Sequence, residues 1–446
     1  MALLHDHSCP CTLTQLDLFT IPPTQTAITA GNWDEYHPIS NLLDGSPIEF
    51  NVAGTPEEYV DLSQTKLHIK AKITNGDGTQ LAVDAPVAPN NLFLQSLFSQ
   101  CEVSLNERLV SPSSNNYPYR AYLETLLNYS RESKETQLTS SLFYKDEASK
   151  FDECNPLEND AAVANSGLKE RYTLSARSRL IDMTGPIHSD IFFQDKLLLN
   201  SIDLKVKLTP SQPEFCLLSS NDQGNYKVSI THASLLVRKV RVNPSISLGH
   251  AKALEMGNAR YPLTRVDTKA FSVPAGTMSY SKDNLFLGQL PQRIVIGLVD
   301  NDAYNGVLGK NCFNFKNMNL NYLSLTVDGM QLSASKPLTP KYTIAGGQSY
   351  IQAYQTLYSG LNKMYKDSGN NISREEYPNG YTLYAFDITP DLNEGGHLNL
   401  VRKGNLRLEM RFGNALPETA MVVVFSEFQN ILEVDRARNI IFDYNV

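Results

Sequence analysis

The feature that most constrains the fold of this chain is an internal repeat, because patterns in its first half recur in the same order in its second half. Apolar and polar residues alternate, the period of a half-buried strand, along residues 101–105 and again along 323–327. The other corresponding pairs are helical stretches around Ala121 and Ala353, alternating strands at 202–208 and 406–412, and long apolar strands at 226–242 and 421–434. We therefore predict two equivalent units.

Each unit is dominated by strands and tight turns. Alternating segments follow one another from Ile48 onward, and Asn-Gly or Asp-Gly pairs at 75–76, 305–306 and 328–329 supply turns between apolar runs. Two strand-rich units of roughly 200 residues, each with one helix in the middle and long loops, suit β-sandwiches of the jelly-roll type. The predicted fold is all-β, with two tandem eight-stranded jelly rolls (a double jelly roll) and a few short helices.

The same patterns give domain boundaries. Residues 1–35 have little periodicity and contain Pro22-Pro23, so we expect an extended N-terminal arm. The first jelly roll is expected at 36–242 and the second at 260–446. Between them, at 243–259, apolar residues at helical spacing predict a linker helix.

Composition argues against several classes of protein. The chain is 41% hydrophobic and 19% charged, typical of a globular protein and not of a disordered one. Its formal net charge is −8, and Lys and Arg never occur more than two in a row, so we expect no direct, sequence-specific binding of nucleic acid. The longest apolar run, 420–425, is too short to span a membrane.

The N-terminus and the cysteines bear on the compartment. The first residues turn polar at once and lack the basic start and apolar core of a signal peptide, so we expect synthesis in the cytosol. The six cysteines are spread from Cys9 to Cys312 in a chain long enough to fold without disulfides. Reduced, mostly buried thiols are therefore expected.

One cluster of potential metal ligands stands out, His5, His7, Cys9 and Cys11. Zinc sites usually separate paired ligands by two to four residues on a folded scaffold, and this cluster offers neither feature. We expect these side chains to pack on a neighbouring surface instead of binding metal.

Other motifs are weaker. Asp300-Asn301-Asp302 resembles a calcium loop whose glycine comes one place late, so we predict a hairpin loop there, and Gly309-Lys310 lacks the rest of a phosphate-binding loop. The histidines outside the arm are isolated from one another in sequence and are interpreted as structural: His37, His68, His188, His232, His250 and His397. We therefore predict no catalytic, cofactor-binding or metal-binding residues and no enzyme activity.

Two other functions suit a tandem sandwich. A two-domain cupin enzyme would need a His-x-His on a strand of each half, whereas the chain has this pattern only at His5 and His7 in the arm. A carbohydrate- or receptor-binding β-sandwich protein needs no fixed motif and remains the alternative.

Segments along nearly the whole chain resemble the major capsid proteins of Polinton (Maverick) elements and the related adintoviruses. The resemblance is carried by these segments: 46–50 (SPIEF), 58–62 (EYVDL), 117–127 (YPYRAYLETLL), 288–294, 302–306 (DAYNG), 313–315 (FNF), 380–387, 389–392 (TPDL) and 425–434 (FSEFQNILEV). Substitutions within the segments remove no strand.

The resemblance implies a virion protein with the double jelly-roll fold of hexon-like capsid proteins. Such chains form homotrimers, which are pseudo-hexagonal capsomers because three chains contribute six similar sandwiches, and these tile an icosahedral shell. The expected partners are two further copies, neighbouring capsomers and a single jelly-roll penton protein at the vertices. The resemblance does not distinguish assembly in the nucleus from assembly in the cytoplasm.

Overall fold

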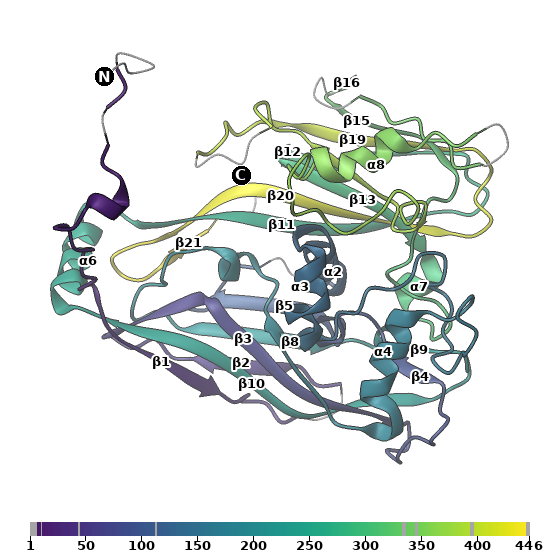
Figure 1. Ribbon diagram of the computed structural model, residues 1–446, viewed down its shortest axis with the longest axis horizontal. Helices are drawn as coiled ribbons and strands as arrows, with labels where there is room; N and C mark the ends of the chain where they lie inside the picture. Colours follow the sequence, from purple (N-terminus) through teal and green to yellow (C-terminus); the bar gives the residue numbers. More distant parts are fainter. Residues whose placement is uncertain are drawn as a thin grey trace.

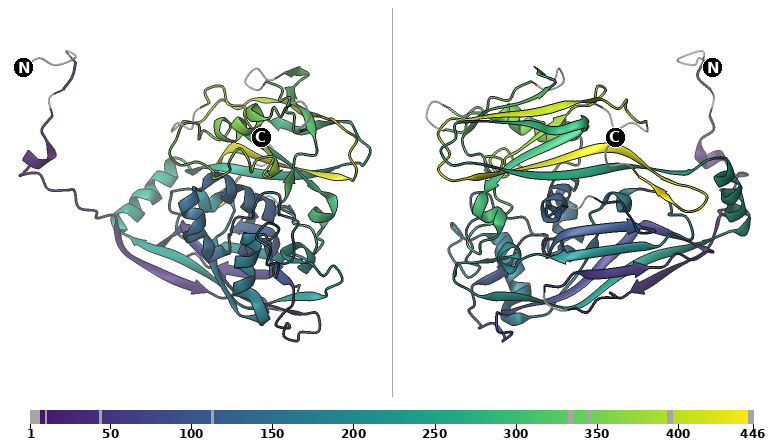
Figure 2. Two further views of the ribbon diagram at one scale, coloured as in Figure 1. Left: turned by 45° about the vertical axis from the view of Figure 1, so that its right-hand side comes forward. Right: turned by 180° about the vertical axis from the view of Figure 1, so that it is seen from behind.

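The computed structural model describes residues 7–9, 11–42, 45–111, 114–331, 336–343, 347–392 and 397–442. These residues form two β-sandwiches stacked on one another, with short helices beside and between them (Figure 1). The N-terminal segment projects away from both sandwiches in all three views (Figure 2).

The first sandwich has two four-stranded sheets, in the orders β1-β10-β3-β7 and β2-β8-β5-β6. Its strands are β1 (Ile28–Tyr36), β2 (Ile48–Val52), β3 (Glu58–Asn75), β5 (Phe98–Leu105), β6 (Arg108–Leu109), β7 (Ile181–Pro186), β8 (Leu204–Pro210) and β10 (Tyr226–Val242).

The second sandwich has the same arrangement, β11-β20-β13-β18 in one sheet and β12-β19-β15-β16 in the other. Its strands are β11 (Ala259–Val273), β12 (Ser279–Gln289), β13 (Arg293–Asp300), β15 (Leu320–Val327), β16 (Met330–Gln331), β18 (Leu383–Asp387), β19 (Lys403–Phe412) and β20 (Ala420–Val434). In each sandwich the first strand pairs with the last, and the two orders match position by position. The prediction of two eight-stranded jelly rolls is confirmed.

Smaller elements complete the structure. The minor strands are β4 (Val87–Pro89) with β9 (Leu217–Ser219), β14 (Phe315–Lys316) with β17 (Asn379–Gly380), and β21 (Ile440–Ile441) beside β20. The α-helices are α1 (Phe93–Ser96), α2 (Tyr117–Asn128), α3 (Arg131–Glu135), α4 (Ser166–Ser175), α5 (Pro213–Cys216), α6 (Pro244–Met256), α7 (Asn301–Asn305) and α8 (Ile351–Ser359). The 3-10 turns are η1 (Thr14–Leu16), η2 (Gln137–Ser141), η3 (Ala176–Ser178) and η4 (Asp190–Phe193).

The repeated segments occupy equivalent positions in the two rolls. Residues 101–105 and 323–327 lie in β5 and β15, which have the same place in their sheets, and the long terminal strands are β10 and β20. The paired helices are α2 and α8, each in the long connection that precedes the sixth strand of its roll, β7 or β18. Helix α6 occupies the stretch between the rolls where the sequence predicts a linker helix.

Two sequence predictions need correction. Strand β1 occupies the last residues of the stretch 1–35 assigned to the arm and continues to Tyr36, and it pairs with β10 from Ile28 opposite Val242 to Tyr36 opposite Leu235. Its side chains are mostly exposed, so backbone hydrogen bonds stabilise the strand without an apolar period that the sequence could reveal. Residues 301–305, predicted as part of a hairpin loop, form α7 because the chain crosses here from the sheet of β13 to that of β15.

The two rolls share their apolar cores. Helix α2 belongs to the first half, yet its Tyr122 stacks on Phe313 of the second half with ring centroids 4.1 Å apart and planes 5° apart. Its Tyr119 stacks on Tyr304 at 5.5 Å. In return, residues at the ends of β11 and β20 pack into the core of the first roll, Tyr261, Leu263, Leu432 and Val434 among them. The rolls are therefore joined by core packing and not by a linker alone.

A buried carboxylate adds polar contacts to this inter-roll interface. The side chains of Asp146 and Arg171 are fully buried and form an ion pair with an N–O distance of 2.8 Å. Asp146 also accepts hydrogen bonds from the side-chain amides of Asn165, at 3.0 Å, and of Asn311 in the second roll, at 3.3 Å. The hydroxyl of Tyr381, also in the second roll, donates to the backbone carbonyl of Asp146. The buried Asp146 thus accepts hydrogen bonds from both halves of the chain.

A second buried cluster lies beside α2. Arg120 donates to Glu124 at 2.9 Å and to Asp190 at 2.6 Å, and His188 Nδ1 lies 2.6 Å from Glu124. Asp190 in turn accepts from the backbone N–H of Val266 on β11. Burial raises the pKa of Glu124, but the charges of Arg120 and His188 and their hydrogen bonds outweigh burial and hold this pKa below its ordinary value.

Replacing Arg171 tests the first cluster. Arg171→Met leaves the charge of Asp146 buried without its cation, so the free energy of unfolding should fall by about 3–5 kcal/mol. The control Arg131→Met removes the exposed pair with Glu135 and should cost less than about 1 kcal/mol. Urea unfolding of both variants measures the difference. Equal losses of stability in the two variants would show that the buried charge of Asp146 does not depend on Arg171.

Glu124 gives a pH-dependent prediction. Because its pKa is lowered in the folded state, its contribution to stability is present above the unfolded pKa of about 4.3 and is lost as the pH falls through the folded value. Glu124→Gln should therefore destabilise the protein at pH 7 by about 1–3 kcal/mol, and by progressively less as the pH falls below about 4. Urea unfolding at several pH values, with Glu135→Gln as the exposed control, measures the trend. The same loss at pH 7 and pH 3 would contradict it.

Candidate functional site

Residues 11–27 leave the body of the molecule, and from here on the name arm means these residues and no longer the predicted stretch 1–35 (Figures 1 and 2). Five of its large apolar side chains are between 65% and 95% exposed: Leu13, Leu16, Leu18, Phe19 and Ile21. At its base the backbone N–H of Asn243 donates to the carbonyl of Ala27 at 2.8 Å. Burying one such side chain contributes about 1.5–3 kcal/mol, so the arm is suited to bind another surface.

The potential metal ligands found in the sequence, which we expect to pack on a neighbouring surface instead of binding metal, belong to the N-terminal end of the chain, at and before the start of this segment. His5 is outside the described residues, while His7, Cys9 and Cys11 are all exposed. The arm itself runs away from both sandwiches (Figure 1).

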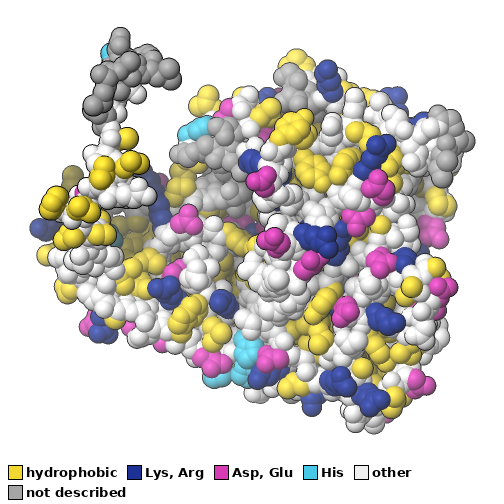
Figure 3. Space-filling model, viewed as in Figure 1, with side chains coloured by type: hydrophobic (Ala, Val, Ile, Leu, Met, Phe, Trp, Pro, Cys, Tyr) yellow, Lys and Arg dark blue, Asp and Glu magenta, His cyan; other side chains and the backbone are white. Residues whose placement is uncertain are grey.

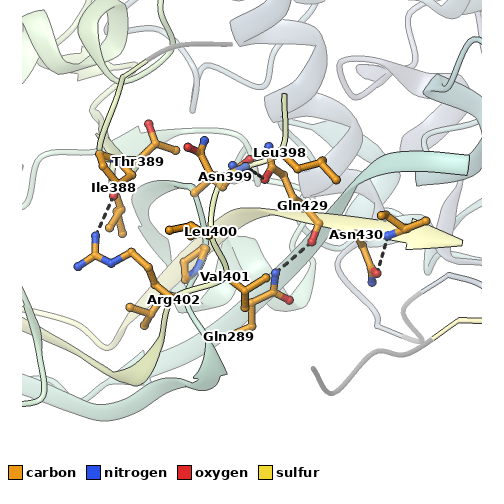
Figure 4. Close-up of a pocket in the computed structure, with 15 residues that line it drawn as sticks. Gln289, Ile388, Thr389, Leu398, Asn399, Leu400, Val401, Arg402, Gln429 and Asn430 are labelled. Carbon is orange, nitrogen blue, oxygen red and sulfur yellow. Dashed lines mark hydrogen bonds between the residues drawn. The ribbon is translucent and has the colours of Figure 1, made fainter. Parts of the chain in front are cut away.

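An apolar groove lies on the second roll, and we call it the Leu398 groove (Figure 4). It has a volume of about 250 Å³, and its apolar lining comes from Leu290, Ile388, Leu398, Leu400, Val401 and Ile431. Leu400 is 92% exposed. Hydrogen bonds hold the segment that forms one wall, since Asn399 N–H donates to Gln429 and Arg402 donates to the carbonyl of Ile388. The groove is therefore a formed apolar surface that this chain leaves uncovered.

A second hollow, of about 820 Å³, lies between α6 and the first roll beside the base of the arm. Its apolar lining includes Leu199, Ile246, Leu254 and Met256, and His250 Nδ1 lies 3.0 Å from the hydroxyl of Tyr59 in its wall. Both hollows are apolar surfaces without a group of clustered nucleophiles or acids among their lining residues.

The segments that resemble a calcium loop and a phosphate-binding loop contain residues that form ion pairs with one another. Lys310 Nζ lies 3.8 Å from Asp300 and 3.5 Å from Asp302, and Lys316 Nζ lies 2.5 Å from Asp300. Two ammonium groups thus face the carboxylates that resemble a calcium loop, which disfavours a cation there.

The cysteines beyond the arm are Cys101, Cys154, Cys216 and Cys312, and all are buried and free. Burial raises the pKa of Cys101 and of Cys216 to about 12, so these thiols stay protonated and unreactive near neutral pH.

The structure does bring together three histidines that are distant in sequence. His37, His68 and His232 lie on the outer face of the sheet formed by β1, β10, β3 and β7, with ring centroids 5.8 Å apart for His37 and His232 and 5.1 Å apart for His68 and His232. The interpretation of each histidine as isolated missed this cluster. Only the strand register could have revealed it. The other histidines have separate partners, such as Asp391 for His397.

Within the described residues, no helix has the length and apolar character needed to cross a membrane.

No protein-family model matches the chain. A Caenorhabditis elegans protein described as uncharacterized protein F54H12.2 is 26% identical over 440 residues, which make up 95% of this chain and 99% of that protein.

Solved viral structures match over the whole length. A chain of the Sputnik virophage cryo-EM structure has a TM-score of 0.64 at 12% identity and covers 100% of this chain and 94% of its own. The PBCV-1 capsid model has a TM-score of 0.56 at 9% identity, with 96% and 99% covered. The mavirus major capsid protein has a TM-score of 0.52 at 13% identity, with 100% and 96% covered. The chain therefore has the double jelly-roll fold of these viral capsid proteins.

Proposed function

We propose that this chain is a hexon-like major capsid protein, which trimerises into pseudo-hexagonal capsomers that tile an icosahedral shell. The observation that carries the proposal is the fusion of two jelly rolls with one strand order in a single chain, matched from end to end by viral capsid proteins. We assign it to the Polinton and adintovirus lineage on the sequence segments given above.

The geometry of the chain supports this role. Two rolls of equal topology, joined through a common core, present two similar lobes at a fixed angle. Three copies around a three-fold axis then place six similar lobes in a ring. Such a trimer can occupy a position with six neighbours in the shell, although it is built from a single kind of chain. A flexible linker between the rolls would not hold this arrangement.

The uncovered apolar surfaces supply contacts between capsomers. The arm exposes a row of large apolar side chains, and the Leu398 groove exposes apolar side chains on the second roll. We propose that the arm of one chain docks on a neighbouring capsomer, with this groove as its acceptor. Contacts between capsomers are then small and reversible before the arm docks, which allows errors of assembly to be corrected.

The remaining partners follow from the same proposal. Five-fold vertices need a different building block, which we assign to a single jelly-roll penton protein. The location is the virion, after synthesis in the host cytosol.

The oligomeric state tests the proposal. Mass photometry of the untagged protein should show a species with three times the mass of one chain, because the two-lobed chain leaves its lateral faces to other copies. A stable monomer at micromolar concentration would refute the capsomer.

Deleting the arm tests its role between capsomers. A chain lacking residues 1–26 keeps β1 and both cores, so its free energy of unfolding should change by less than about 1 kcal/mol and its trimers should persist. Shell assembly should fail, as particle counts by electron microscopy would show. The double variant Leu18→Ser and Phe19→Ser should reproduce the defect without shortening the chain.

The groove is tested in the same assay with Leu398→Ser and Leu400→Ser, which should also yield trimers without shells. Loss of the trimer in the deletion variant would place the arm inside the capsomer. Normal shells from the groove variant would exclude the groove as the acceptor.

A further inference from the structure

The histidine cluster on the first roll combines metal ligands from three strands. Glu35 on β1, His68 on β3 and His232 on β10 offer one ligand atom each, and these atoms all lie within 4.8 Å of one another. Figure 3 shows histidine side chains gathered beside acidic ones at the lower edge of the molecule. The sheet face that carries the cluster is partly open to solvent, since Glu35 is exposed and both histidines are half-buried.

The antiparallel register creates this juxtaposition. His68 is opposite Ser234 on β10, and Glu35 is opposite Leu236, two residues further along the same strand. His232 precedes Ser234 by two residues, so its side chain leaves the same face of the sheet. A β-bulge between Ile230 and His232 shifts the pairing of β10 with β3 at this point. Bulges frequently redirect a side chain beside a functional site.

Hydrogen bonds orient the donors. His68 Nε2 lies 2.6 Å from Asp182 on β7, and its Nδ1 lies 3.4 Å from the hydroxyl of the buried Ser234. His232 Nε2 lies 3.6 Å from a carboxylate oxygen of Glu35 and 3.3 Å from the same hydroxyl. One nitrogen of each ring and one oxygen of Glu35 therefore converge above Ser234. An imidazole whose other nitrogen is held by a carboxylate is the usual arrangement of a histidine that binds metal.

The charge balance also suits a cation. Two carboxylates, Glu35 and Asp182, face three imidazoles, and one cation, Lys70 on β3, lies opposite His232 in the strand register and 3.9 Å from Asp182. Neutral imidazoles together with one ligating carboxylate leave a negative site. Two imidazoles and one carboxylate form a set that binds zinc with an open fourth position.

We propose that Glu35, His68 and His232 bind one zinc ion on the outer face of the first roll. His68 binds through Nδ1, His232 through Nε2 and Glu35 through a carboxylate oxygen, while Asp182 positions His68. Because the site faces solvent, small rotations of these side chains bring the ligand atoms to bonding distance from the ion. The site departs from the sequence-based expectation of no metal ligands, and it does not depend on the proposed function.

The bound ion would stabilise the pairing of β1, an edge strand, with the rest of the sheet. Strand β1 buries little of its side-chain surface and, among the strands that the structure describes, pairs with β10 alone, yet it follows the arm directly. An ion shared by β1, β10 and β3 connects that strand to two others through its ligands. Zinc binding should therefore raise thermal stability and slow the exchange of β1 amides.

The test uses the full-length protein after treatment with a chelator, titrated with zinc by isothermal calorimetry. The wild type should bind one equivalent, and the double variant His68→Gln and His232→Gln should bind none. Asp182→Asn should bind about 10–100-fold more weakly, since it removes a group that only orients a ligand. Hydrogen exchange with and without zinc reports whether β1 is the strand that is protected.

Two controls make the result specific. His397→Gln removes an exposed histidine that also has a carboxylate partner, and it should leave binding unchanged. Cys9→Ser with Cys11→Ser should also bind as the wild type does. Thermal unfolding without zinc should be the same for all variants, which excludes misfolding as the cause. Absence of binding to the wild type, unchanged binding by the double histidine variant, or loss of binding in the cysteine variant would each overturn the proposal.

Discussion

The buried ion pair of Asp146 and Arg171, with the stacked aromatic rings beside it, determines how the two halves of the molecule sit relative to one another. A carboxylate removed from water is stable only with donors in fixed positions, and Asp146 takes them from both rolls. Tyr122 on Phe313 fills the adjoining apolar space. A change of angle between the rolls would break the polar contacts and the packing together, so the pair of rolls behaves as one body.

The proposed function depends on that rigidity. A capsomer must present the same lateral surfaces to each neighbour. If the two rolls moved relative to one another, the entropic cost of fixing them would weaken every contact between capsomers. The residues that stabilise the fold are thus different from the residues that remain available to bind other copies. The cores lie within and between the rolls, while the arm and the Leu398 groove remain uncovered.

The sequence predicts the elements whose side chains alternate between a core and solvent. Strands β3, β5, β8 and β19 have that period. The recurrence of the segments that form β5, β8 and β10 as those that form β15, β19 and β20 predicted the double jelly roll. Strand β1 was missed because hydrogen bonds to β10 define it while its side chains face solvent. Helix α7 was missed because its five residues carry no helical period, and the chain crosses between sheets there.

The candidate surfaces were predictable to different extents. The lack of periodicity and the two prolines indicated an arm, although its apolar residues gave no sign of the groove. The cluster of Glu35, His68 and His232 joins positions more than thirty residues apart from one another, so it depends on register that no local pattern contains. Asp146 and Asn311 likewise meet only through the packing of the two rolls.

The central claim is that one chain supplies two equivalent lobes of a six-lobed tile, and single-particle electron microscopy of the purified protein tests it most directly. Class averages should show a particle with a hexagonal outline and three-fold symmetry, in which six lobes surround the axis. Small monomers or two-fold dimers, of the kind expected for a carbohydrate-binding sandwich, would contradict the account.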